Sequence, residues 1–440
     1  MSLIDFSLQC GRLWKNAGKS ADQIQTESIA AFRRMLEHAW KNTRFYPAFW
    51  GRSGICYEDL RVIEPGDIPC ITKEDVRKNY ADFSTVSLRK DRTGEWIPKK
   101  KAAVIHSSGS TGIPLQFLYS RRAMTMVEAN FVRLSNLGGK KRVGWRDLPI
   151  RNIHAASVGE GYASALLLTD GLSRYHAKCI VLNASEPLAE WVEKTGDFCP
   201  NFLSGYPSCL AMLLDLQKEG KIDLHPLKVI TGGEPLKEDL KMEFEKCFDA
   251  DVIDYYGCCE SLMVGAGSSW YQGMYLFDDM NYAEVDDKGH LILTPLYNPL
   301  FPLIRYRLDD LVEGFSRTGR GELPFTHIDR ILGRDEDILW FRNEDGNPDF
   351  LHPLVLDDLN VKGLTSYQFI QKNDELFYVD CIMESSDPAI EGEIRRQLDE
   401  MLRRKKMQNV HYEIIHRSRL QRNPKSGKIP LTIRQKESGR

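Results

Sequence analysis

A short segment rich in serine and glycine is the part of the sequence best suited to bind phosphate. Residues 106–114 read His-Ser-Ser-Gly-Ser-Thr-Gly-Ile-Pro, and a strand-like run follows at 115–119. Glycines let backbone N–H groups approach an anion closely, and the hydroxyls add donors that rotate to fit. It is not a Walker A loop, because that motif needs Lys-Ser or Lys-Thr directly after its last glycine. Alone, such a segment is more often an ordinary flexible turn.

Five further segments with chemically capable side chains follow in the chain. They are residues 231–235 (Thr-Gly-Gly-Glu-Pro), 254–260 (Asp-Tyr-Tyr-Gly-Cys-Cys-Glu), 305–311 (Arg-Tyr-Arg-Leu-Asp-Asp-Leu), 333–337 (Gly-Arg-Asp-Glu-Asp) and 423–428 (Asn-Pro-Lys-Ser-Gly-Lys). Their carboxylates suit a hard cation or hydroxyl groups, and their lysines suit anions. Each segment alone also fits a plain turn, a core tyrosine, a surface glutamate or a solvated lysine. The functional interpretation of these segments therefore depends on their fixed order along the chain.

The apolar pattern predicts α/β layers that place these segments at strand ends. After a helical N-terminal region near residues 29–40, short apolar runs alternate with amphipathic segments. The runs lie at 104–105, 115–118, 179–182, 228–230 and 251–253, and several end in glycine- or serine-rich turns. Ligands gather at such strand ends in open α/β sheets.

The second half of the chain predicts antiparallel strands and then a small separate unit. Apolar runs at 284–285 and 290–293 precede a turn punctuated by prolines. A second compositional break falls at 333–337, and the strands and basic helix beyond it indicate an α+β unit of about a hundred residues. We therefore expect two domains, comprising residues 1–334 and 335–440.

The composition is that of an ordinary globular protein. The 440 residues are 42% hydrophobic and 28% charged, with a net charge of −3. No apolar run approaches the roughly 18 residues that span a bilayer, and the N-terminus lacks a signal-peptide pattern. We expect a cytoplasmic protein without a membrane or nucleic-acid partner. The ten cysteines show no zinc or disulfide spacing, so we expect most to be reduced core thiols.

Positive charge is concentrated near the C-terminus. Residues 391–440 hold 14 Lys and Arg residues against 6 Asp and Glu residues. Part of this charge closes a predicted amphipathic helix that ends in Arg403, Arg404, Lys405 and Lys406. Two interpretations stay open: a solvated face that complements the helix dipole, or a docking surface for an acidic partner or a phosphorylated ligand.

With these segments in this order, the chain resembles the adenylate-forming superfamily of acyl-CoA synthetases. Residues 205–208 and 301–307 are similar in particular to the branch that contains phenylacetate-CoA ligase and CapK-type proteins. The resemblance runs from about residue 65 to 430. It implies an α/β fold with a large N-terminal domain of layered sheets, including a distorted β-barrel-like part, and a small mobile C-terminal α+β domain.

The resemblance implies that ATP and Mg²⁺ bind at these segments. The phosphate loop corresponds to Ser107, Ser108, Gly109, Ser110, Thr111 and Gly112. Ile113 stands where many relatives have a lysine, which removes one cationic contact. Tyr256, between Tyr255 and Gly257, corresponds to the residue that packs on adenine, and Glu260 to the Mg²⁺ carboxylate. Asp310 corresponds to the ribose-binding aspartate, although Asp309 takes a place usually held by glycine.

Other positions match the family's substrate and hinge elements. Gly233 and Glu234 resemble the turn along the adenine, and Arg334 resembles an arginine that reaches the nucleotide. Glu336 occupies the hinge position. We also expect Gly232, Tyr206 and Pro207 to line the acyl pocket.

Lys428 resembles the catalytic lysine that bridges the substrate carboxylate and the α-phosphate during adenylation. The resemblance then implies transfer of the acyl group to a pantetheine thiol after the small domain swings. Some relatives carry a structural zinc after the Tyr-Gly-x-x-Glu segment, but residues 268–275 contain no Cys or His, so we expect none.

The expected function is ATP-dependent ligation of a carboxylic acid to a thiol. The acid is expected to be aromatic, such as a benzoate, hydroxybenzoate or phenylacetate, and the acceptor to be CoA or an acyl carrier protein. The alternative is an inactive nucleotide- or acyl-binding protein of the same fold. Self-association as a homodimer stays open.

Overall fold

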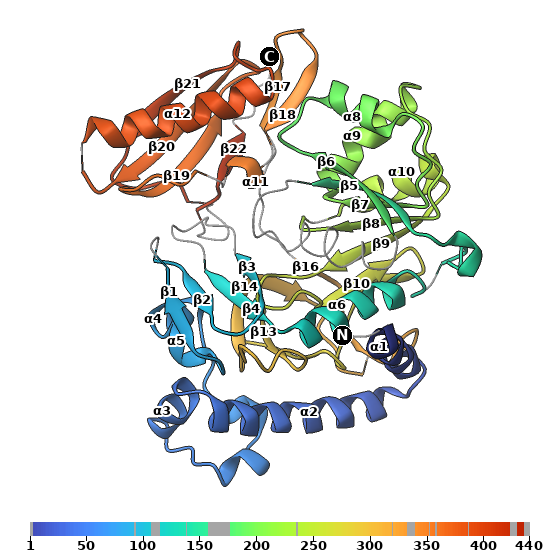
Figure 1. The fold of residues 1–440 in the computed structure, drawn as a ribbon, viewed down its shortest axis with the longest axis vertical. Helices are drawn as coiled ribbons and strands as arrows, with labels where there is room; N and C mark the ends of the chain where they lie inside the picture. The colour runs from blue at the N-terminus through green and yellow to red at the C-terminus, as the bar shows by residue number, and fades with distance from the viewer. Residues whose placement is uncertain are drawn as a thin grey trace.

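The computed structural model is centred on an eight-stranded sheet (Figure 1). It describes residues 3–91, 94–106, 115–137, 139–156, 177–234, 236–318, 320–331, 339–351, 353–356, 359–385, 387–422 and 429–434. The strands, in spatial order, are β15 (Thr326–Ile328), β11 (Tyr271–Leu276), β10 (Gly265–Ser268), β9 (Asp251–Tyr256), β8 (Lys228–Gly232), β7 (Phe202–Gly205), β5 (Arg151–Ala156) and β6 (Lys178–Asn183). Strands β6 to β9 are parallel, and β10, β11 and β15 continue the sheet in antiparallel pairs.

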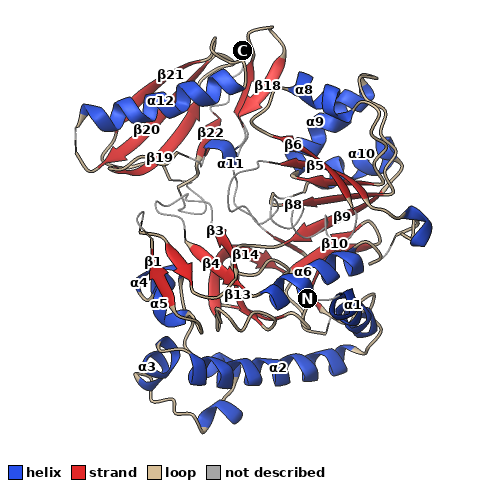
Figure 2. Ribbon diagram, in the orientation of Figure 1, coloured by secondary structure: helices blue, strands red, loops and turns tan. Residues whose placement is uncertain are grey.

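Three helices cover one face of the parallel strands (Figure 2). They are α8 (Leu188–Thr195), α9 (Pro207–Lys218) and α10 (Glu238–Phe248). Ile153, Leu203, Val229 and Val252 occupy matching positions on neighbouring strands and are all buried against these helices. Burial on both faces explains why these strands appear as continuous apolar runs in the sequence.

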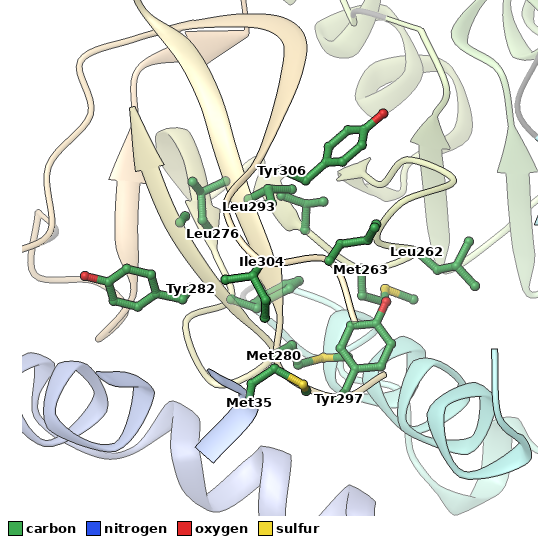
Figure 3. Packing of buried hydrophobic residues seen from close by; sticks show 14 of the residues in the cluster. Met35, Leu262, Met263, Leu276, Met280, Tyr282, Leu293, Tyr297, Ile304 and Tyr306 are labelled. Carbon is green, nitrogen blue, oxygen red and sulfur yellow. The ribbon is translucent and has the colours of Figure 1, made fainter. Parts of the chain in front are cut away.

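A second core joins the other face of the sheet to the N-terminal helices. The elements are α1 (Leu3–Ala17), α2 (Ala21–Asn42), α3 (Phe45–Gly51), α4 (Lys73–Lys78), α5 (Tyr80–Phe83), α6 (Arg121–Leu134), and the paired strands β1 (Leu88–Lys90) with β2 (Trp96–Pro98) and β3 (Ala103–His106) with β4 (Gln116–Tyr119). Figure 3 shows part of this core, where Met35 of α2 lies close to Met280. A buried ion pair of 2.8 Å between Arg133 and Asp279 ties α6 to it.

A four-stranded antiparallel sheet lies beside the large one. Its strands are β12 (Asn281–Val285), β13 (His290–Pro295), β14 (Tyr306–Glu313) and β16 (Arg330–Ile331). They include both antiparallel runs predicted from the sequence. Because Ile304 and Tyr306 are buried in the second core, the 305–311 segment is held against the large sheet.

The C-terminal residues form a smaller layered unit with its own core. It contains β17 (Leu339–Arg342), β18 (Pro348–Leu351), α11 (Pro353–Leu356), β19 (Leu364–Gln371), β20 (Leu376–Met383), α12 (Pro388–Arg404), β21 (His411–His416) and β22 (Thr432–Arg434). Helix α12 covers a sheet of order β21-β20-β19-β22. The predicted α/β class with a small α+β unit is confirmed. The exact boundary at 334 stays a prediction, since residues 332–338 lie outside the described ranges.

The charges of α12 are largely paired within the helix. Arg395 contacts Glu391 and Arg396 contacts Glu393, each at 2.7 Å, and Arg404 contacts Glu400 at 2.9 Å. This agrees with a solvated, self-neutralised face. Lys405 departs from the prediction because its side chain is fully buried.

All ten cysteines are free thiols. The expectation that most are core residues was too simple, since only Cys209 and Cys381 are fully buried and Cys56 and Cys199 are exposed. Across the described ranges, no helix combines the length and apolar character needed to cross a membrane.

Candidate nucleotide-binding site

Two of the predicted segments meet at the ends of neighbouring parallel strands. Gly232 at the end of β8 pairs in register with Tyr255 near the end of β9. A Cβ atom on Gly232 would lie 2.8 Å from the carbonyl oxygen of Tyr255 and 2.9 Å from its ring. The absence of a side chain at 232 therefore permits the close approach of these two strand ends.

Tyr206 packs over the turn that follows β8. Gly233 has a φ of +85°, and a Cβ atom there would lie 2.6 Å from Cε1 of the Tyr206 ring. Tyr206 is buried and directly precedes Pro207, the first residue of α9. The structure thus places Tyr206 against Gly233, and the acyl-pocket role of Tyr206, Pro207 and Gly232 stays a prediction.

We expect Gly233→Ala to destabilise the protein more than Gly220→Ala. Both glycines have left-handed backbones, which cost an alanine about 1–2 kcal/mol. A Cβ at 220 meets nothing within 4 Å, whereas one at 233 strikes the Tyr206 ring, which adds about 1–3 kcal/mol of overpacking. Thermal unfolding of both variants measures the difference. Equal melting temperatures would contradict the contact with Tyr206.

Glu234 caps helix α9. Its carboxylate accepts hydrogen bonds from the backbone N–H of Ser208 at 3.1 Å and from the Ser208 hydroxyl at 3.0 Å. A negative charge at a helix N-terminus is stabilised by the unpaired N–H groups and by the helix dipole. Glu234 therefore links the turn after β8 to α9, a structural role that the sequence did not indicate.

The second pair of predicted residues joins β9 to β14. The Tyr256 hydroxyl donates to Oδ2 of Asp310 at 2.8 Å. Burial, and then the charge of Asp310, raise the pKa of Tyr256 well above its usual value, so the hydroxyl stays a donor. Asp309, on the neighbouring position of β14, is exposed. Of the two adjacent carboxylates, Asp310 is thus the one held next to Tyr256.

Glu260 is oriented by a residue that the sequence did not single out for a role. The Tyr306 hydroxyl donates to Oε1 of Glu260 at 3.0 Å. Burial and the charge of Glu260 raise the pKa of Tyr306, which keeps its proton on the phenol. Both Tyr256 and Tyr306 therefore connect the 254–260 segment to strand β14, and each orients one carboxylate.

Cys259 connects the same segment to both flanks of the predicted phosphate loop. Its thiol lies 3.2 Å from the carbonyl oxygen of His106, the last residue of β3. Its own carbonyl accepts a 2.8 Å hydrogen bond from the Tyr119 hydroxyl at the end of β4. Strands β3 and β4 pair directly, so Cys259 is bonded to both strands that flank residues 107–114 in the sequence, at His106 beside that segment and at Tyr119 at the far end of β4.

Several predicted site residues lie outside the described ranges. They are Ser107, Ser108, Gly109, Ser110, Thr111, Gly112, Arg334, Glu336 and Lys428. Their roles stay predictions. The described residues bring together Gly232, Gly233, Glu234, Tyr256 and Asp310 from the predicted set, and the structure adds Ser208, Tyr306, Tyr119 and Cys259.

The chain is similar to known proteins in both sequence and fold. A family model described as AMP-binding enzyme matches residues 58–285. Phenylacetate-coenzyme A ligase of Pseudomonas putida is 26% identical over 369 residues, which cover 77% of this chain and 76% of that protein. Protein CapK of Staphylococcus aureus is 22% identical over 353 residues, which cover 71% and 68% of the two chains.

Among solved structures, 2-hydroxyisobutyryl-CoA ligase shares the fold at 19% identity in several functional states. Its thioesterification state, in complex with 2-HIB-AMP and CoA, superposes with a TM-score of 0.61 and covers 96% of this chain and 91% of that one. Its open conformation gives 0.56, covering 95% and 93%. The postadenylation state with 2-HIB-AMP gives 0.55, covering 96% and 91%.

Proposed function

The chain belongs to the family of AMP-binding enzymes, and we propose that it ligates a carboxylic acid to a thiol at the expense of ATP. In the first half-reaction a carboxylate oxygen attacks the α-phosphate of ATP, which forms an acyl-AMP and releases pyrophosphate. In the second, a pantetheine thiol attacks the acyl carbonyl, loses its proton and expels AMP. The observation that carries the proposal is the convergence of Tyr256 with Asp310, and of Tyr306 with Glu260, beside the phosphate-loop strands.

Each oriented carboxylate has a distinct role in this proposal. Asp310 accepts hydrogen bonds from the ribose hydroxyls, and the Tyr256 ring packs on adenine above the Gly232 and Gly233 turn. Glu260 would hold Mg²⁺, because a carboxylate that already accepts from Tyr306 offers the hard oxygen ligand this cation prefers. When bound, Mg²⁺ neutralises the charge of the phosphates.

The residues outside the described ranges complete the proposed site. Serine and threonine hydroxyls at 107–111, with Gly109 between them and Gly112 after them, bind the β- and γ-phosphates, and Arg334 reaches the nucleotide. Lys428 places an ammonium between the attacking carboxylate and the α-phosphate. Glu336 lies at the proposed hinge between residues 1–334 and 335–440.

The proposed substrate is an aromatic acid, and the proposed acceptor is CoA. The support is the naming of several relatives as phenylacetate-coenzyme A ligases and the CoA bound in the 2-hydroxyisobutyryl-CoA ligase structure. Transfer to the phosphopantetheine of an acyl carrier protein is the second candidate acceptor. We propose a cytoplasmic location, in keeping with a substrate pair of small acid and nucleotide.

We further propose that the structure corresponds to the arrangement for acyl transfer. The support is the higher TM-score with the thioesterification state of 2-hydroxyisobutyryl-CoA ligase than with its open or postadenylation states. Those structures are of one enzyme in different states, so the difference in TM-score supports a match in the arrangement of the parts.

Tyr256→Phe is expected to raise the KM for ATP about tenfold, with a smaller change in the KM for the acid. The variant keeps the ring that packs on adenine but removes the hydroxyl that orients Asp310, and one hydrogen bond to a charged group contributes about 1.5–3 kcal/mol. Tyr271→Phe is the matched control, because its buried hydroxyl bonds only the carbonyl of Ala266 in the same sheet among the contacts identified. An unchanged KM for ATP in Tyr256→Phe would contradict the proposed role of Asp310.

The proposed function is tested by exchange of labelled pyrophosphate into ATP in the presence of Mg²⁺. Benzoates, hydroxybenzoates, phenylacetates and fatty acids are compared, each with and without enzyme. We expect strong exchange that depends on one class of aryl acid. Absence of exchange with every acid, together with measurable ATP binding, would favour the inactive binding protein.

A further inference from the structure

A buried lysine joins the C-terminal unit to the α/β layer. Lys405 lies at the C-terminal end of α12, and its side chain is 0% exposed. Its Nζ atom lies 2.8 Å from Oδ1 of Asp349. The same atom donates to the carbonyl oxygens of Ala184 at 3.1 Å and Glu186 at 3.0 Å, both in the turn between β6 and α8.

Apolar contacts surround these hydrogen bonds. Phe350 of β18 and Val355 of α11 are buried in the same cluster as the residues of α8 and α9. The Lys405 ammonium also lies 4.6 Å from the centre of the Phe350 ring. In Figure 1 the β17–β18 hairpin and the end of α12 lie next to α8. The ammonium is thus part of an interface between two units that fold around separate cores.

The charge balance of Lys405 depends on that interface. An ammonium has three N–H donors, and here one carboxylate and two carbonyls accept from it. Burial of a charge is unfavourable unless each donor finds an acceptor. Asp349 belongs to the same unit as Lys405, but both carbonyls belong to the other. Separation of the units would therefore remove two of its three acceptors.

The interface also lies close to the candidate nucleotide site. Cys209, in the first turn of α9, is buried, and burial and the charge of Glu234 raise the pKa of its thiol while the charge of Lys405 lowers it. Both Glu234 and Lys405 therefore lie near enough to the Cys209 thiol to influence its pKa.

We propose that Lys405 is a positioning residue that holds the C-terminal unit in the arrangement for acyl transfer. This inference rests on the proposed function, because only an enzyme with two half-reactions needs the unit in a defined place for one of them. Loss of the contacts with Ala184 and Glu186 would lower the population of the transfer arrangement. The transfer step would then slow, whereas adenylation would not.

The test compares Lys405→Gln with Lys406→Gln, an exposed neighbour of the same type. Two rates are measured separately: pyrophosphate exchange, and formation of thioester from preformed acyl-AMP and CoA. For Lys405→Gln we expect thioester formation to fall about 10-fold to 100-fold, the effect of losing a charged hydrogen bond. Pyrophosphate exchange should stay within about twofold of the wild type, and Lys406→Gln should leave both rates unchanged.

A double variant guards against general destabilisation. Lys405→Met with Asp349→Asn removes the inter-unit hydrogen bonds without leaving a buried carboxylate unpaired. The same selective loss of thioester formation supports the proposal. Equal losses in both half-reactions, or no loss in thioester formation, would overturn it.

A readout independent of catalysis separates this inference from the proposed function. Amide hydrogen exchange over residues 183–190 is expected to speed up in Lys405→Gln and not in Lys406→Gln. Unchanged exchange there would overturn the anchoring role even in an active enzyme. Faster amide exchange in a protein that forms no acyl-AMP would support the anchoring role of Lys405 and contradict the proposed ligase activity.

Discussion

Lys428→Ala is expected to slow acid-dependent pyrophosphate exchange by roughly 10²–10³, the effect of removing one preorganised electrostatic group. In the transition state the negative charges of the carboxylate and the α-phosphate come close together. An ammonium at that point therefore stabilises the transition state more than the ground state with bound substrates. ATP binding, measured by calorimetry, should persist, since the adenine, ribose and phosphate contacts belong to other residues.

Lys425→Ala is the matched control for this prediction, because it removes the same charge from the same segment, 423–428. We expect its exchange rate to remain near that of the wild type. An unchanged rate in Lys428→Ala would refute the catalytic assignment. A loss of equal size in both variants would assign the effect to the charge of the segment rather than to one lysine.

Glu260→Gln is expected to lower the rate of adenylation by roughly 100-fold or more and to raise the Mg²⁺ concentration needed for half-maximal rate. Glutamine can still accept the hydrogen bond from Tyr306, so the local structure should survive. It lacks the negative charge that binds a divalent cation. Initial rates across a Mg²⁺ titration measure both effects.

Tyr306→Phe distinguishes the effect of the Glu260 charge from the effect of the Glu260 orientation. It leaves the Glu260 carboxylate in place but removes the hydroxyl that donates to Oε1, so we expect a smaller loss than in Glu260→Gln. If Glu260→Gln retained the wild-type rate and Mg²⁺ dependence, the proposed metal role of Glu260 would be wrong.

Local patterns in the sequence predicted much of the fold and part of the site. The apolar runs at 104–105, 179–182, 228–230 and 251–253 all fall within strands. Those at 228–230 and 251–253 belong to central parallel strands, which are covered on both faces and are therefore continuously apolar. The Gly232 and Gly233 turn was also predicted at a strand end. The reason for glycine at these two positions is the close approach of Tyr255 and Tyr206, which only the structure shows.

Contacts between distant parts of the chain could not be predicted in the same way. Tyr119 reaches Cys259 across 140 positions, and Lys405 reaches Ala184 across 221. Nothing local distinguishes Lys405 from the basic residues beside it, and its burial follows from the docking of a separate unit. The nucleotide role of Glu234, which came from a family resemblance, stays a prediction, and the structure adds its hydrogen bonds with Ser208 at the start of α9.

The central claim is that an acyl-AMP is formed, and labelled oxygen tests it most directly. The acid that supports pyrophosphate exchange is prepared with ¹⁸O in its carboxylate and incubated with ATP, Mg²⁺, CoA and enzyme, and the products are analysed by mass spectrometry. Attack of the carboxylate on the α-phosphate predicts one ¹⁸O in the phosphate of AMP for each thioester formed. Label in inorganic phosphate, or AMP without label, would contradict the account.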